Sequence, residues 1–180
     1  MPDADHTDDA ADGGVIIRRA ERRDLAAIGR LGGLLVRQHF SYDPRRFMSP
    51  AEDIDEGYAW FLGTQLEQPD VVLFAAERQG EIVGYAYAGI EPQSWKELRE
   101  LAGFIHDVVV DEAARGRGIG AALMEAAADW LEARGAPRLM LWTAERNAPA
   151  QRLFARLGFR RTMIEMTREA GEGTHGRGRP

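Results

Sequence analysis

The stretch VVVDEAARGRGIGA, residues 108–121, decides how this chain folds. An apolar run ends at Val110, a short polar turn follows, and glycines then alternate with other residues before a helical pattern begins. This order predicts a strand, a glycine-rich loop and the start of a helix. The first turn of a helix carries backbone N–H groups without internal partners and the positive end of the helix dipole. Because glycines let a phosphate approach those groups closely, we expect a phosphate-bearing ligand here.

Two familiar phosphate-binding loops fit this stretch poorly. A P-loop has Lys followed by Ser or Thr after its last glycine, whereas this chain reads IGA at 119–121. A dinucleotide-binding loop of the form G-x-G-x-x-A can be read from Gly116 to Ala121, with Glu145 placed as a ribose-binding acid. In that fold the glycines follow the strand directly, whereas residues 111–115 intervene here. A nucleotide-binding oxidoreductase domain, which would bind NAD, stays as a rival interpretation.

A third interpretation is a resemblance to a known family. The segment RGRGIG at 115–120 resembles the R/Q-x-x-G-x-G/A pattern of the GNAT superfamily of N-acetyltransferases. The segment NAPAQRLFARLGF at 147–159 resembles the same family's N-x-x-A-x-x-L-Y-x-x-x-G-F helix. The order of predicted elements fits the family over residues 15–167, and the resemblance is strongest over 106–159.

The resemblance implies a fold and a cosubstrate. The fold is a single α/β domain whose central, mixed, twisted sheet is flanked by helices and whose fourth and fifth strands splay apart. The pantetheine arm of acetyl-CoA then enters the gap, where backbone groups of the fourth strand hold it and one N–H meets the thioester oxygen. No metal is implied. The residues implied to hold acetyl-CoA are Val108, Val109, Val110, Arg115, Gly116, Arg117, Gly118, Ile119, Gly120, Ala121 and Asn147.

Apolar periodicity predicts the remaining elements. Ser49 is expected to cap a helix that has Pro50 in its first turn, and Asn147 is expected to cap another. The apolar run at 138–143 suits a strand buried on both faces. The predicted strands cover about 15–19, 71–77, 81–88, 104–110, 138–143 and 159–166, the last of which closes the sheet. A turn at Gln79 and Gly80 is expected to join the second and third strands as a hairpin, and residues 41–44 are expected to form a loop after the first helix.

His106 is the candidate general base. It lies in an otherwise apolar strand, and regular alternation places it on one face with Val108 and Val110, with Asp107 on the other. A bulge in this strand would change the direction of Asp107. Its unperturbed pKa near 6.5 suits it to accept a proton from an amine at neutral pH. A structural histidine bonded to a backbone carbonyl is the competing interpretation. Three further carboxylates near strand ends are not ranked by the sequence: Glu77, Glu91 and Glu165.

Phe154 departs from the family pattern, which has a tyrosine at this position that can protonate the leaving thiolate. The position therefore supplies no acid. We expect Phe154 to be a buried core residue. The substitution also keeps a different interpretation open, in which the domain binds acyl-CoA without catalysis and acts as a sensor or partner. Aromatic residues that fall in the region of the family's acceptor pocket are Tyr42, Phe47, Tyr58, Trp60 and Trp95.

Composition limits the function classes. The chain has 180 residues, 44% of them apolar, which suits one domain, and it has no cysteine for disulfides, zinc thiolates or a thiol nucleophile. Five aspartates before Val15 supply −5 of the net charge of −6, leaving −1 for the remainder, so nucleic-acid binding has little support. Residues 1–14 and 169–180 read as disordered tails around a domain at 15–168. We expect a cytoplasmic protein without membrane contact, compatible with a homodimer, that acts on a small-molecule or protein amine.

Overall fold

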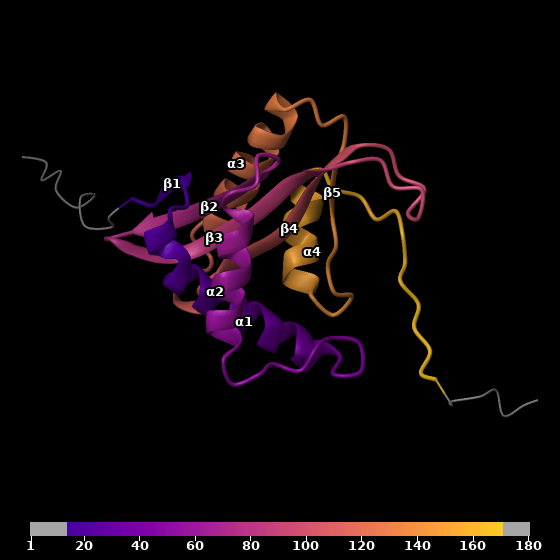
Figure 1. Cartoon of the computed structure of the whole chain (residues 1–180), viewed down its shortest axis with the longest axis horizontal. Helices are drawn as coiled ribbons and strands as arrows, with labels where there is room; N and C mark the ends of the chain where they lie inside the picture. Colours follow the sequence, from indigo (N-terminus) through magenta and orange to yellow (C-terminus); the bar gives the residue numbers. More distant parts are fainter. Residues whose placement is uncertain (1–13, 171–180) are drawn as a thin grey trace, which may run out of the picture.

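A five-stranded twisted sheet forms the centre of the computed structural model, which describes residues 14–170 (Figure 1). The spatial order of the strands is β1-β2-β3-β4-β5. The first four are antiparallel neighbours, and β4 and β5 run parallel, which confirms the mixed sheet. The strands are β1 (Ile16–Arg19), β2 (Val71–Arg78), β3 (Glu81–Glu91), β4 (Ala102–Val110) and β5 (Leu139–Leu141).

Helices cover both faces of this sheet (Figure 1). One core contains α1 and α2 side chains together with Tyr85 and Val109 from the sheet, and the other contains α3 side chains together with Ala86 and Ile105. None of the helices within residues 14–170 is long and apolar enough to cross a bilayer. The helices are α1 (Leu25–Tyr42), α2 (Ile54–Gln65), α3 (Ile119–Ala133) and α4 (Ala148–Arg156), with 3-10 turns η1 (Arg22–Asp24) and η2 (Glu112–Ala114).

Glycines in α1 allow α2 to pack directly against its backbone. A Cβ at Gly29 would lie 2.4 Å from the carbonyl oxygen of Asp55, and a Cβ at Gly32 would lie 2.0 Å from the ring of Tyr58. Glycine is unfavourable within a helix, so its presence at these positions requires a local cause. The cause is the close contact between the two helices, which in turn brings Tyr58 over the sheet.

A matched pair of substitutions tests this contact. Gly29→Ala is expected to destabilise the fold by about 1–3 kcal/mol, because overpacking forces the helices apart. Gly57→Ala on the exposed side of α2, where a Cβ would meet nothing within 4 Å, is expected to stabilise it by about 0.5–1 kcal/mol. Chemical denaturation of both variants measures the difference. Equal effects would show that the helices do not depend on this close approach.

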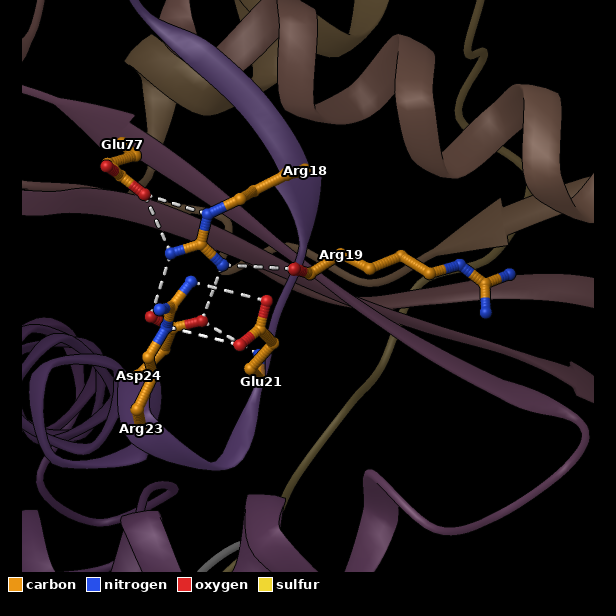
Figure 2. Close-up of polar contacts among 6 residues, drawn as sticks. All are labelled: Arg18, Arg19, Glu21, Arg23, Asp24 and Glu77. Carbon is orange, nitrogen blue, oxygen red and sulfur yellow. Dashed lines mark hydrogen bonds and ion pairs between the residues drawn. The ribbon is translucent and has the colours of Figure 1, made fainter. Parts of the chain in front are cut away.

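A partly buried ion-pair cluster joins β1, β2 and the start of α1 (Figure 2). Arg18 donates from Nη1 and Nη2 to the two carboxylate oxygens of Asp24 at 2.7 and 2.9 Å, and from Nε to Glu77 at 2.8 Å. Asp24 also accepts the backbone N–H of Glu21 at 2.8 Å. Asp24 is only 5% exposed, and its bond with Arg18 holds its pKa below the usual value. The cluster therefore ties the chain ahead of α1 to the sheet.

One predicted strand at the far edge of the sheet was wrong, and so was the burial predicted for its neighbour at 138–143. Residues 159–166 are not in a strand, and the side chains of Met163, Ile164 and Met166 are exposed. Ion pairs from Arg46 to Glu165 and from Arg45 to Glu169 instead direct this segment toward the loop after α1. β5 consequently lies at the edge of the sheet, and its three residues are half-buried rather than buried on both faces.

The ends of the first two helices differ from the prediction, whereas the first hairpin agrees with it. α1 continues through the predicted loop to Tyr42. α2 begins at Ile54 with Asp53 as its N-cap, not at Ser49, because its register follows its contact with α1. The β2–β3 hairpin is confirmed, with Gly80 at φ +81°. The predicted tails at 1–14 and 169–180 lie almost wholly outside the described residues and stay a prediction.

Candidate functional site

The glycine loop joins β4 to α3 with an open backbone. Gly116 and Gly118 both have φ +79°, a left-handed conformation that strongly favours glycine. A Cβ at either position would meet no atom within 4 Å, so the space beside the loop is free. Gly118 is the N-cap of α3 and provides no side-chain cap, so the N–H groups of the first turn are available to a ligand. The predicted start of this helix is confirmed.

Cationic side chains flank this loop. Arg115 turns back toward the strand and donates from Nε to the carbonyl oxygen of Val110 at 3.0 Å. Arg115 and Arg117 are both exposed. Gly120, the second residue of α3, faces Leu153 of α4, where a Cβ would lie 3.3 Å from that side chain. The loop thus combines a helix N-terminus with positive charge, which is the arrangement that binds phosphate groups.

The edge of β4 beside the loop is unpaired toward β5. The parallel pairing of the two strands covers three residue pairs and ends at Ile105 and Leu141. β4 continues to Val110, and in the described part of the chain no strand pairs with this side of residues 106–110. Backbone groups along this stretch can therefore bond a ligand that lies beside β4 as an additional strand would. The splayed fourth and fifth strands of the prediction are confirmed.

A β-bulge at His106 interrupts the alternation of β4. Tyr87 of β3 pairs with Asp107, and the next residue, Ala88, pairs with Ile105. His106 is therefore the extra residue on the bulged strand. A bulge of this kind bends the strand and redirects the side chains that follow it.

The bulge corrects the predicted faces of β4. Val108 and Val110 pack against the core beneath α3, whereas His106 stacks on Tyr87 beneath α1 and α2. Asp107 lies on this second face as well, since it accepts a hydrogen bond from α2. The expectation that His106 shares a face with Val108 and Val110, opposite Asp107, was wrong. The error arose because the prediction assumed regular alternation along β4, whereas the register with β3 shifts at His106.

His106 is held between two aromatic rings. Its ring centroid lies 4.6 Å from that of Tyr87 and 4.9 Å from that of Phe104, with interplanar angles of 26° and 25°. Its Nε2 lies 3.3 Å from Oε1 of Glu91, and its side chain is 27% exposed. Burial lowers the pKa of His106 from 6.5, and the negative charges of Glu91 and Asp107 oppose that shift. The imidazole is therefore neutral at pH 7 and able to accept a proton.

Asp107 is the residue that the sequence did not single out. One of its oxygens accepts hydrogen bonds from Tyr58 at 2.7 Å and from Tyr85 at 3.0 Å. Burial raises the pKa of Asp107, and the two hydroxyl donors oppose that shift. Desolvation likewise raises the pKa of Tyr87 to about 12, so this hydroxyl stays protonated at neutral pH. The contacts with Tyr58 and Tyr85 fix Asp107 in place beside the bulge.

The other candidate residues divide clearly. Among the unranked carboxylates, Glu91 contacts His106, whereas Glu77 belongs to the Arg18 cluster and Glu165 pairs with Arg46. Of the aromatic residues placed near the acceptor pocket, Tyr58 reaches the site through Asp107. Trp60 and Trp95 are 74% and 82% exposed, and Tyr42 and Phe47 contact the ring of His39.

Asn147 and Phe154 lie on α4. Asn147 caps the helix by accepting the backbone N–H of Ala150 at 3.3 Å, as predicted. Phe154 is half-buried against the α3 core and lies 6.2 Å from the ring of Phe159, so it is less buried than expected. Within residues 14–170 no three His, Asp or Glu side chains form a group that could hold a metal ion.

Comparison with known proteins places this arrangement in a family. A model of the acetyltransferase (GNAT) family matches residues 35–159. The mycothiol acetyltransferase of Thermomonospora curvata is 32% identical over 85% of this chain and 46% of its own length. That of Amycolatopsis mediterranei is 33% identical over 68% of this chain and 39% of its length. The chain therefore spans less than half the length of these relatives.

Two further matches extend over most of both proteins. The uncharacterized N-acetyltransferase YhfO of Bacillus subtilis is 32% identical over 79% of this chain and 88% of its own length. The structure of the aminoglycoside N-acetyltransferase AAC(6')-Iy, determined with CoA, superposes with a TM-score of 0.68. It covers 90% of this chain and 98% of its own at 18% identity, which supports the shared fold.

Proposed function

The chain belongs to the GNAT family of acetyltransferases, and from that premise we propose that it transfers an acetyl group from acetyl-CoA to the primary amine of a small molecule. The observation that carries the proposal is that three features follow one another along the chain: the bulge at His106, the unpaired edge of β4 and the open N-terminus of α3. In this order they would provide a general base, a strand edge for the pantetheine arm and a phosphate-binding site.

The residues of the loop and strand fit acetyl-CoA as a substrate. The N–H groups at Gly118, Ile119, Gly120 and Ala121 would bind the pyrophosphate, which the lack of a side-chain cap on the helix supports. Arg115, Gly116 and Arg117 complete the loop, and Asn147 lies at the start of α4. Backbone groups of Val108, Val109 and Val110 would bond the pantetheine arm, and one N–H on this edge would stabilise the oxyanion.

His106 provides the proton acceptor in this proposal. The lone pair of the neutral amine attacks the thioester carbonyl carbon, and the amine nitrogen gives a proton to His106 as the tetrahedral intermediate forms. The C–S bond then breaks, so that the products are an amide and the thiolate of CoA, which takes up a proton from solvent. The chain has no cysteine, so a cysteine-linked acetyl intermediate is not available and attack within a ternary complex is favoured.

The chemistry of the site favours a cationic acceptor. The Glu91 carboxylate, 37% exposed, lies beside His106, whereas the rings of Tyr87 and Phe104 are buried against the imidazole. Relatives are named for mycothiol and, at the level of the fold, for aminoglycosides, which are small molecules rather than proteins. Cytoplasmic location, a homodimer and the lack of nucleic-acid or membrane partners stay predictions.

An acceptor screen tests the proposed function. Purified protein is incubated with acetyl-CoA and a panel of small amines, aminoglycosides, polyamines and amino acids, and free CoA thiol is measured. We expect thiol release that depends on one class of amine and yields an acetylated product by mass spectrometry. Tight acetyl-CoA binding without release for any amine would instead support a non-catalytic acyl-CoA-binding domain, which the loss of the hydroxyl at Phe154 keeps in view. Binding of NAD in place of CoA would support the oxidoreductase alternative.

A pair of glycine substitutions tests the phosphate loop. Gly118→Val and Gly135→Val place the same side chain at φ +79° and φ +80°, at opposite ends of α3. Both are expected to cost about 1–2 kcal/mol of stability, because a side chain disfavours the left-handed region. Only Gly118→Val should weaken acetyl-CoA binding, by at least tenfold in calorimetry. Equal affinities in the two variants would remove the loop from the binding site.

A further inference from the structure

We propose that Glu91 is the positioning residue of His106, and that it holds the imidazole in the tautomer with its proton on Nε2 and leaves Nδ1 to accept the proton of the amine. The carboxylate oxygen Oε1 of Glu91 lies 3.3 Å from Nε2. An ionised carboxylate only accepts hydrogen bonds, so the nitrogen facing it must be the one that carries the proton. The inference rests on the proposed function, in which His106 is the base.

Stacking alone does not orient the ring. Tyr87 and Phe104 lie nearly parallel to the imidazole and set its plane. A rotation of the ring by half a turn within that stack exchanges the nitrogen edges without changing the plane. A polar partner at one edge is needed to select between the two orientations, and Glu91 supplies it. The partner also decides which nitrogen is protonated, as hydrogen bonds to histidine generally do.

The structure fixes Glu91 from its own side. It is the last residue of β3 and pairs with Ala102 of β4. Its carbonyl oxygen accepts a hydrogen bond at 3.3 Å from Arg99, whose side chain is 8% exposed and is itself paired with Glu97 at 2.8 Å. This arrangement limits the movement of the backbone from which the Glu91 carboxylate reaches His106.

The neighbouring charged groups do not take this role. Asp107 follows His106 directly, but its bonded oxygen is directed to Tyr58 and Tyr85. His39 of α1 acts on Asp107, whose pKa it lowers. Tyr87 contacts His106 through its ring rather than its hydroxyl. Glu91 is 37% exposed, so its carboxylate keeps contact with water.

Nitrogen-15 NMR of the imidazole tests the tautomer in the resting protein, without acetyl-CoA. In the full-length chain we expect His106 above its pKa to give the chemical shifts of the Nε2-protonated form. In Glu91→Ala the two tautomers should become mixed, and the pKa of His106 should fall further because a stabilising negative charge is lost. Glu91→Gln should lower the pKa in the same way. Glu81→Gln, at the exposed first position of β3, is the matched control and should change neither.

Kinetics of the same variants test the consequence. Glu91→Ala is expected to lower kcat about 10- to 100-fold with KM for acetyl-CoA nearly unchanged, a size that corresponds to losing a hydrogen bond with a charged group. Unchanged imidazole shifts in Glu91→Ala, or an unchanged kcat, would overturn the proposal. A wild-type protein that releases no thiol would overturn the proposed function. The NMR measurement needs no turnover, so it would still determine the tautomer of His106 in that case.

Discussion

Replacing His106 by glutamine is expected to lower kcat about 10²–10⁴-fold at neutral pH, the range that general-base catalysis contributes. Glutamine keeps a polar side chain of similar reach in the stack between Tyr87 and Phe104 but cannot take up a proton. The thermal midpoint and the Kd of acetyl-CoA should change little, because neither the glycine loop nor the strand pairing involves this side chain.

The pH dependence provides a second measurement of the same prediction. Burial lowers the pKa of His106, so the acidic limb of kcat/KM in the wild type should lie below the ordinary value of 6.5. Above that limb the imidazole is neutral and active, and below it the protonated ring cannot act as a base. The limb should disappear in His106→Gln. Near-native turnover with an unchanged limb would assign His106 a structural role and direct attention to Glu91 acting through water.

Replacing Arg18 by methionine is the change with the largest expected effect on stability. It leaves the carboxylate of Asp24 buried without its partner, and removing one member of a buried pair costs about 3–5 kcal/mol. The lower end is expected, since the Arg18 side chain is itself 22% exposed. In the wild type, Arg18 donates hydrogen bonds to the carboxylates of both Asp24 and Glu77 (Figure 2). Urea denaturation followed by circular dichroism measures the loss.

Arg23→Met is the matched control. Arg23 pairs with Glu21, and both side chains are exposed, at 70% and 57%, so the pair contributes at most about 1 kcal/mol. A second control replaces Asp24 by asparagine in the Arg18→Met background, which should recover part of the loss because the buried charge is gone. If Arg18→Met cost no more than Arg23→Met, the cluster would not hold β1 to the start of α1.

Acid titration separates the same variants. The pKa of Asp24 is lowered from 3.8 by its bond with Arg18, so the folded state binds protons less readily than the unfolded state. The stability from this pair is therefore present above the ordinary pKa and is lost as the pH falls through the lower folded value. Without Arg18 this contribution disappears, and the free energy of unfolding should fall less steeply with acid than it does in the wild type.

Local chemistry allowed much of the fold to be predicted. The glycines at 116 and 118, the cap at Asn147 and the turn at Gly80 each follow from the backbone preferences of a few consecutive residues. The order of strand, loop and helix could be predicted in the same way, and with it the open helix N-terminus that suits a phosphate.

Long-range contacts decided what the sequence predicted wrongly. The start of α2 depends on how Tyr58 and Asp55 meet the glycines of α1, and residues 159–166 lie outside the sheet, where Glu165 pairs with Arg46. Such pairings join residues far apart in the chain, so periodicity within a segment carries no information about them.

The candidate site shows the same division. The sequence by itself determined that a strand ending in a glycine loop carries His106, and that no cysteine is available as a nucleophile. Only the tertiary structure decided that His106 is the bulged residue, that Asp107 lies on the same face, and that Glu91 rather than Glu77 or Glu165 is its partner. The physical reason is that a bulge arises from the register between β3 and β4, and register is a property of two strands together.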